Sequence, residues 1–186
     1  MKQTTTALLD EALARHPLLT SCREAMLAAA AALLQSHAGG GKVLVCGNGG
    51  SAADAEHLVG ELMNKYLIRR TIPADHASAL GKAAGADGKY LAANLQQAVP
   101  AVSLVSQSSL ITSVSNDVAA DVVFAQQVYA YGRPEDVLIA ISTSGNARNV
   151  FAWALRARSK GGAGAEKLLA APDQHLARNT AFAMGH

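Results

Sequence analysis

The chain of 186 residues is long enough for one domain with a proper hydrophobic core. Half of its residues are hydrophobic by type but only 4% are aromatic, which favours closely packed helices over a core of bulky strands. The formal net charge of +2, without a dense basic cluster, gives no case for nucleic acid as a partner. Two cysteines are too few for a disulfide framework, so a reducing cytoplasm is the expected location.

The N-terminal residues carry polar and acidic side chains within the first predicted turns and show no export signal. We also find no run that approaches the roughly 20 apolar residues needed to span a bilayer. The expectation is therefore a soluble cytoplasmic protein with no membrane partner.

Two helices are predicted before the first strand. Residues 4–16 show an amphipathic pattern, and the following proline interrupts it. The second helix opens at Ser21 and Glu24, which have the spacing of a capping box, and continues to three consecutive glycines at 39–41.

Residues 42–61 carry the clearest functional signal. The apolar run 43–46 ends in the sequence GNGGS at 47–51, and an alanine-rich segment with helical spacing follows. This order predicts a strand, a tight turn and a helix. Backbone N–H groups and the positive end of the helix dipole converge at such a turn, so it predicts an anion site. Ser51 is expected to cap the helix, with Asp54 at the capping-box position.

His57 and Glu61 lie four residues apart on the same predicted helix. On a helix these side chains are neighbours, and they could share a metal ion or a reacting proton. The alternative is an ordinary surface pair of histidine and glutamate. Their place two turns beyond the predicted anion site favours the functional interpretation.

The segment that follows departs from a compact α/β pattern. The basic residues 65–70 are interpreted mainly as a helix end whose cations face the negative end of the dipole. Residues 74–99 are interpreted as an insertion, with a short helix over 90–95, and it is either a lid or a tolerated surface loop. Three glycines are expected to form a flexible loop within it: Gly81, Gly85 and Gly88.

Two further strands are predicted, at 101–105 and 136–142. The continuous apolar run of the later strand is typical of a parallel sheet that is buried on both faces. Asn116 and Asp117 lie between these strands and, taken alone, form a common turn or cap.

A second anion cradle is predicted directly after the third strand. Its sequence STSGN at 142–146 supplies three hydroxyls and a glycine ahead of a helix predicted over 147–159. Loops at the carboxyl ends of parallel strands are where open α/β folds bind ligands, so both cradles are expected to line one crevice.

Three of these segments occur together in a known order: GNGGSAADAEHLVGEL from residue 47, Asn116-Asp117, and ISTSGN from residue 141. In this order they resemble the bacterial phosphoheptose isomerases of the sugar isomerase (SIS) superfamily, over residues 33–160. The resemblance implies an α/β fold, a parallel sheet of Rossmann/flavodoxin-like SIS type flanked by helices. It implies one SIS domain over 1–186, with N-terminal helices at 1–38, a core at 42–160 and an atypical tail at 161–186.

The resemblance implies an aldose–ketose isomerase that converts sedoheptulose 7-phosphate to D-glycero-D-manno-heptose 7-phosphate. Glu61 would be the catalytic base, and zinc would bind His57 and Glu61. A homotetramer with sites between subunits is also implied. The implied substrate-binding residues are Asn48, Gly49, Gly50, Ser51, Glu61, Asn116, Asp117, Ser142, Thr143 and Ser144.

Two other functional classes remain open for this sequence. The first is a non-catalytic SIS module that binds a sugar phosphate or a protein, of the replication-initiator-associating type. Glu61 favours the enzyme over this module, while the deficient tail favours the module. The second is a nicotinamide-cofactor turn at 47–52, but the acidic residue that such a site needs at the end of the second strand is missing.

The tail departs from the family pattern. The glutamine and the later histidine that complete the family's metal site have no counterpart at the right spacing, because Gln174 and His175 are adjacent. Thr180 is the only β-branched residue of 162–186, so no further strand is predicted and one edge of a three-stranded sheet stays uncovered. We interpret the chain as a shortened or frame-altered variant of a fuller SIS protein, with an incomplete C-terminal part.

Overall fold

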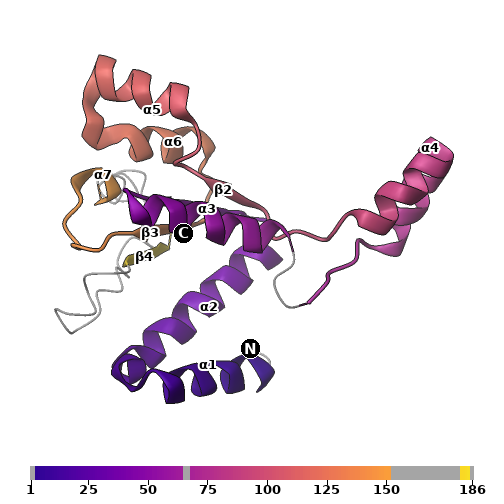
Figure 1. Ribbon diagram of the computed structural model, residues 1–186, viewed down its shortest axis with the longest axis horizontal. Helices are drawn as coiled ribbons and strands as arrows, with labels where there is room; N and C mark the ends of the chain where they lie inside the picture. Colours follow the sequence, from indigo (N-terminus) through magenta and orange to yellow (C-terminus); the bar gives the residue numbers. More distant parts are fainter. Residues whose placement is uncertain (1–2, 65–67, 152–180, 185–186) are drawn as a thin grey trace.

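A computed structural model of the chain describes residues 3–64, 68–151 and 181–184 (Figure 1). A single four-stranded sheet lies at the centre and helices pack on both of its faces. The helices are α1 (Gln3–Arg15), α2 (Arg23–Ala38), α3 (Gly50–Met63), α4 (Ala74–Asn94), α5 (Ser108–Val114), α6 (Val123–Tyr131) and α7 (Arg148–Phe151). The strands are β1 (Val43–Gly47), β2 (Ala101–Ser103), β3 (Val137–Ile141) and β4 (Ala181–Met184). Three short helical turns are η1 (Pro17–Cys22), η2 (Ser115–Ala119) and η3 (Ala120–Val122).

The strand order is β2-β1-β3-β4, and β1 pairs in parallel with both β2 and β3. Val43 is in register with Ala101 on one side and with Val137 on the other. The carboxyl ends of these three strands therefore meet at one edge of the sheet. The predicted α/β architecture with a parallel sheet is confirmed.

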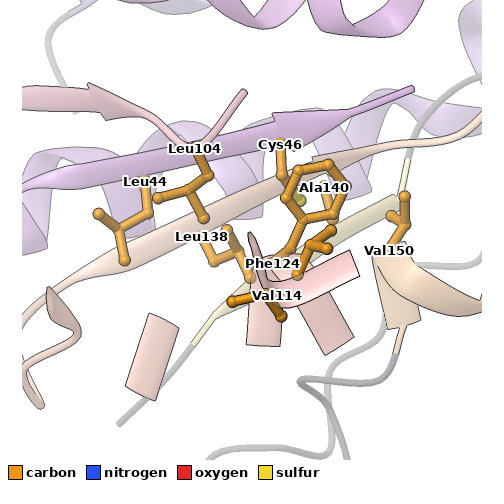
Figure 2. Close-up of a cluster of buried hydrophobic side chains, with 9 residues drawn as sticks. Leu44, Cys46, Leu104, Val114, Phe124, Leu138, Ala140 and Val150 are labelled. Atoms are coloured by element: carbon orange, nitrogen blue, oxygen red, sulfur yellow. The ribbon is translucent and has the colours of Figure 1, made fainter. Parts of the chain in front are cut away.

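Successive side chains of β1 point to opposite faces of the sheet, so the strand contributes to two separate hydrophobic cores. Leu44 and Cys46 face the side covered by α5 and α6, where they pack with Phe124 (Figure 2). Val43 and Val45 face the opposite side and pack beneath α2 and α3. Burial on both faces explains the unbroken apolar run of this strand, since neither side meets water.

The two N-terminal helices are confirmed as α1 and α2, but the predicted capping box is wrong. The 3-10 helix η1 leads directly into α2, and Cys22 occupies the cap position without a side-chain hydrogen bond. Ser21 Oγ lies 4.0 Å from Cys22 Sγ. Because η1 continues directly into α2, the first N–H groups of α2 are not left at a free helix end, and a serine cap is not needed there.

The stretch Pro17–Ala38 is long and apolar enough, at 22 residues, to cross a membrane by length and composition alone. The expectation that no run approaches such a length was wrong. Alanine supplies much of this apolar character, and packed helices of soluble proteins and signal sequences meet the same criterion. The stretch is therefore weak evidence for a membrane.

Helix α4 replaces the flexible loop that was predicted for the insertion. Its backbone leaves the helical region at Ala84 and Gly85, where Gly85 has a φ of 54°, so α4 is a hairpin of two short helices. The hairpin is tightly closed, because a Cβ on Gly88 would lie 1.8 Å from the carbonyl oxygen of Leu80. Gly85 thus allows the turn and Gly88 allows the close helix contact, while a Cβ on Gly81 would make only an ordinary contact with Lys89 Cγ at 3.7 Å.

The base of α4 is fixed to the C-terminal end of α3. Arg70 donates hydrogen bonds to the carbonyls of Leu62, Asn64 and Gln97, and a β-bridge joins Thr71 to Gln96. Arg70 therefore places its charge at the C-terminal end of α3, but the helix ends at Met63 and the described residues 68–70 are not helical, so the basic segment is not itself the helix end that was predicted. Since α3 begins at the loop after β1 and runs away from it, α4 leaves from the opposite end and projects from the body (Figure 1). Among the described residues, α4 does not cover the loops that follow β1, β2 and β3 (Figure 1).

Strand β4 corrects the prediction that the tail adds no strand. Residues 181–184 pair antiparallel with β3, with Ala181 opposite Ala140 and Met184 opposite Val137. The outer edge of β3 carries backbone N–H and C=O groups that need partners, and a short segment satisfies them through its backbone without β-branched side chains. Gln174 and His175 lie outside the described residues.

An ion pair joins β1 and β3 at their amino ends. Asp136 is 6% exposed, and its carboxylate accepts hydrogen bonds from the backbone N–H groups of Lys42 and Arg133, at 2.9 and 2.8 Å. Lys42 Nζ contacts the same carboxylate and donates to the carbonyl oxygen of Tyr131 at 2.7 Å. These contacts tie β1 to β3 at the amino edge of the sheet, and we call the buried ion pair of Lys42 and Asp136 the charged clamp.

Candidate active site

The loop after β1 forms an open cradle. Gly49, at a φ of 56°, occupies the cap position of α3, and nothing lies within 4 Å of a Cβ placed on Gly49 or Gly50. Gly47 is enclosed instead, because a Cβ there would lie 2.6 Å from the carbonyl oxygen of Ser51. A ligand can thus approach the backbone at the helix N-terminus without meeting a side chain.

Ser51 is not the helix cap that its sequence position predicted. It lies inside the first turn of α3 and is 5% exposed, and its backbone N–H donates to the carbonyl oxygen of Asn48 at 3.0 Å. Gly49 can take the cap position because its backbone adopts a conformation that side chains disfavour. Asp54, expected at the capping-box position, is exposed on the same helix.

His57 and Glu61 lie on one face of α3, as predicted. Their Nε2 and Oε1 atoms are 3.5 Å apart, with side chains 76% and 35% exposed. The second carboxylate oxygen of Glu61 is buried and has no hydrogen-bond partner among the described residues. Because an unpaired buried carboxylate oxygen is costly, this atom is the position where a proton, a cation or a substrate hydroxyl would be stabilised.

Cys46 is not a nucleophile for this site. Its side chain is fully buried at the end of β1, and burial raises the pKa of its thiol to about 12. The thiol therefore stays protonated at neutral pH and packs as a small apolar group.

The loop after β3 supplies hydroxyl donors. Ser142 is buried at 5% exposure, while Thr143 and Ser144 are exposed. Ser144 Oγ accepts a hydrogen bond from the backbone N–H of Asn146 at 3.2 Å, and Gly145 turns the loop at a φ of 65°. This arrangement keeps two hydroxyls available to a ligand. Of the helix predicted over 147–159, the structure describes α7 up to residue 151.

A reciprocal pair of amides joins the two cradles. Asn48 Nδ2 donates to Asn149 Oδ1 at 2.8 Å, and Asn149 Nδ2 donates to Asn48 Oδ1 at 2.9 Å. Asn48 belongs to the predicted site, but Asn149 was not among the predicted residues. The two residues are 101 positions apart in sequence, and no local pattern links positions so far apart.

Asn116 and Asp117 lie on η2, a π-helical turn. Both are exposed, and Asn116 Nδ2 donates to Asp117 Oδ1 at 2.8 Å. Among the described residues, no hydrogen bond or ion pair links them to either cradle. A π-helical turn is often found at functional sites, so the local geometry is compatible with the predicted role.

Glu56 and Ser106 form a contact that sequence reasoning missed. Ser106 Oγ donates to Glu56 Oε1 at 2.8 Å and so links the loop after β2 to α3. The buried side chain of Gln127 donates to the carbonyl oxygen of Leu104 in the same loop, at 2.8 Å. All three loops at the carboxyl edge of the parallel strands are thus held by side-chain contacts.

His57 and Glu61 supply two donors of the types that bind zinc, and the orphaned Glu61 oxygen suits a cation. Within residues 3–64, 68–151 and 181–184, no group of three His, Cys, Asp or Glu side chains is placed to hold a metal. A catalytic zinc ordinarily takes three protein ligands. The described residues therefore fit a metal only in part, and no chemical step is assigned to one.

The fold defines an α/β protein in which the loops after three parallel strands meet at one edge of the sheet, which is where open α/β folds bind their ligands. The SIS domain family matches residues 12–92 and 91–163. The chain belongs to the SIS domain family.

Curated relatives agree with this membership. The phosphoheptose isomerase of Rhodospirillum rubrum is 40% identical over 143 residues, which cover 77% of this chain and 62% of the relative. The phosphoheptose isomerase of Solidesulfovibrio magneticus is 39% identical over 152 residues, covering 82% of this chain and 62% of the relative. The chain spans about three fifths of the length of these relatives.

A solved structure of phosphoheptose isomerase from Neisseria gonorrhoeae superposes with a TM-score of 0.55 at 31% identity. The superposition covers 84% of this chain and 65% of that protein. The similarity supports the SIS fold that the three motifs implied.

Proposed function

We propose that the chain is an aldose–ketose isomerase of sugar phosphates, acting on sedoheptulose 7-phosphate to give D-glycero-D-manno-heptose 7-phosphate. The observation that carries this proposal is the buried, unpaired oxygen of Glu61, on the helix that begins at the first cradle. The similarity to curated phosphoheptose isomerases supports the choice of substrate.

The two cradles hold the phosphate. Both loops supply uncharged hydrogen-bond donors, and they follow two adjacent strands. The first loop offers the backbone N–H groups of Gly49 and Gly50, and the second offers the hydroxyls of Thr143 and Ser144. Ser51 and Ser142 lie behind them and shape the two turns. Asn116 and Asp117 are the proposed partners of the sugar hydroxyls.

Glu61 moves the proton. Isomerisation transfers a proton between two adjacent carbons through an enediol, which needs one base that can also return the proton. One Glu61 oxygen faces His57 while the other has no partner, so the free oxygen is available to take and return the proton. His57 is the neighbour that orients the carboxylate.

Zinc on His57 and Glu61 is a further part of the proposal. Residues of a neighbouring subunit, or residues outside the described ranges, would have to complete its ligands. Metal analysis of the purified protein, before and after a chelator, measures whether zinc is retained.

We propose a homotetramer located in the cytoplasm, with no nucleic acid and no membrane as partner. Support comes from leucines of the N-terminal helical segment that are exposed in the single chain: Leu8 at 64%, Leu18 at 83% and Leu34 at 53%. Light scattering after size-exclusion chromatography measures the assembly.

The decisive experiment is turnover of sedoheptulose 7-phosphate by the wild type and by Glu61→Gln. The amide keeps the shape of the carboxylate but cannot act as a base, so we expect kcat to fall at least about 100-fold. Substrate binding should change only a few-fold. Glu24→Gln, at a glutamate that is 86% exposed on α2, is the matched control and should turn over normally.

Equal turnover by Glu61→Gln and the wild type would remove Glu61 from the chemistry. A wild type that binds the sugar phosphate but never turns it over would instead favour the alternative, a non-catalytic SIS module. Calorimetric titration with the same sugar phosphate separates these outcomes.

A further inference from the structure

Asn149 lies outside the predicted set of site residues, yet it makes the direct side-chain link between the two cradles. Its amide exchanges two hydrogen bonds with Asn48, at 2.8 and 2.9 Å. β1 and β3 are in parallel register up to Gly47 and Ile141, so the two loops leave neighbouring strands at the same level. Asn48 lies in the first loop and Asn149 lies on α7, which follows the second loop, so the amide pair joins the first loop to the helix that begins after the second.

Asn149 is held firmly by its neighbours. The next residue, Val150, is fully buried and belongs to the core cluster that also contains Phe124 and Ala140 (Figure 2). The preceding residue, Arg148, forms an ion pair with Asp121 at 2.8 Å. Burial of Val150 anchors the backbone beside Asn149, while the ion pair of Arg148, whose side chain is 86% exposed, adds only a weak contact.

Asn48 is held less firmly. It is exposed and is followed by Gly49 and Gly50, where added Cβ atoms would meet nothing within 4 Å. A glycine pair without packing contacts gives the backbone wide conformational freedom. Asn149 is therefore the fixed partner of this amide pair, and Asn48 is the residue that it holds.

We propose that Asn149 is a positioning residue that holds Asn48, and with it the first cradle, at the distance from the second cradle that a bound phosphate requires. The inference rests on the proposed function, because it assumes that both cradles hold one phosphate. A primary amide has two N–H groups, and the reciprocal pair uses only one from each residue. Each side chain thus keeps one N–H for a ligand or for water.

The test is a double-mutant cycle on Asn48→Ala and Asn149→Ala. Loss of two neutral hydrogen bonds is expected to raise KM for sedoheptulose 7-phosphate about tenfold. The kcat should stay within about twofold, since the phosphate is bound equally in the ground state and the transition state. The double variant should be no weaker than either single variant, because each change alone already breaks the pair.

Asn94→Ala is the matched control. Asn94 is exposed at the end of α4, and its Nδ2 donates to the carbonyl oxygen of Tyr90 at 2.8 Å. This change should leave KM unchanged. Additive effects of the two site variants would overturn the proposal, and so would a lowered Tm of Asn149→Ala with an unchanged KM.

The same cycle on the dissociation constant of the sugar phosphate, measured by calorimetry, separates this inference from the proposed reaction. A wild type that binds without turnover contradicts the isomerase but still reports the coupling of Asn48 and Asn149. A wild type that binds neither the sugar phosphate nor inorganic phosphate overturns both proposals.

Discussion

Strands β1 and β3 are cross-linked at both ends, and the two links differ in chemistry. At the amino ends, Lys42 and the buried Asp136 form a charged clamp whose carboxylate accepts two further backbone hydrogen bonds. Beyond the carboxyl ends, Asn48 in the loop after β1 and Asn149 on α7 form a neutral, solvent-accessible amide pair. The same two strands thus end in a closed structural edge and in an open, polar one.

The difference follows from what each edge must do. A buried charge that loses its partner is strongly unfavourable, so the Lys42–Asp136 clamp resists opening and stabilises the sheet. The neutral amide pair has no charge to desolvate, so it stabilises the sheet by less, and its two hydrogen bonds hold the loops at the open edge together. The open edge is therefore left accessible to a ligand, while the closed edge keeps the strands in register.

Asp136→Ala should give the largest effect, and it tests the closed edge. Removing the carboxylate leaves Lys42 partly buried without its charge partner and frees two backbone donors, so the free energy of unfolding should fall by about 3 kcal/mol. Urea denaturation measures this loss. Glu11→Ala, which removes an exposed ion pair with Arg15, is the control and should cost less than about 1 kcal/mol. If both variants lost the same free energy of unfolding, burial would not make the Lys42–Asp136 pair more stabilising than an exposed ion pair.

Gly47→Ala should give the next largest effect, at the open edge. The added Cβ would lie 2.6 Å from the Ser51 carbonyl oxygen, so the loop must move away from α3. A displacement of this kind should raise the dissociation constant for the sugar phosphate about 100-fold. Gly81→Ala is the control, since its Cβ would meet Lys89 Cγ at an ordinary 3.7 Å. Unchanged binding by Gly47→Ala would show that the first cradle does not touch the ligand.

Ser144→Ala should give the smallest effect. Set beside Gly47→Ala, it compares how much the second and the first cradle contribute to sugar phosphate binding. It removes one exposed hydroxyl and the 3.2 Å hydrogen bond from the Asn146 N–H, so sugar phosphate binding should weaken about fivefold. The Tm should stay the same. Ser113→Ala removes an exposed hydroxyl on α5, whose Oγ donates to the Leu110 carbonyl at 3.1 Å, and should not affect binding. Tighter binding by Ser144→Ala would exclude the hydroxyl as a phosphate donor.

Local features of the sequence were enough to predict the central part of the molecule. The apolar runs that became β1 and β3, the glycine turn at 47–50 and the spacing of His57 and Glu61 are properties of neighbouring residues. Periodicity and backbone freedom act over a few residues, so they can be read without knowledge of the fold. The parallel arrangement was predicted from the continuous apolar run of the third strand, which is typical of strands buried on both faces.

The tertiary structure decided the features that depend on distant parts of the chain. It replaced the predicted Ser51 cap by Gly49, closed the insertion into the α4 hairpin and added β4 along the free edge of β3. It also brought Asn149 to Asn48 across 101 positions. Local pattern sets which segments form helices and strands, but the energy of these long-range contacts arises only when the packed sheet brings the segments together.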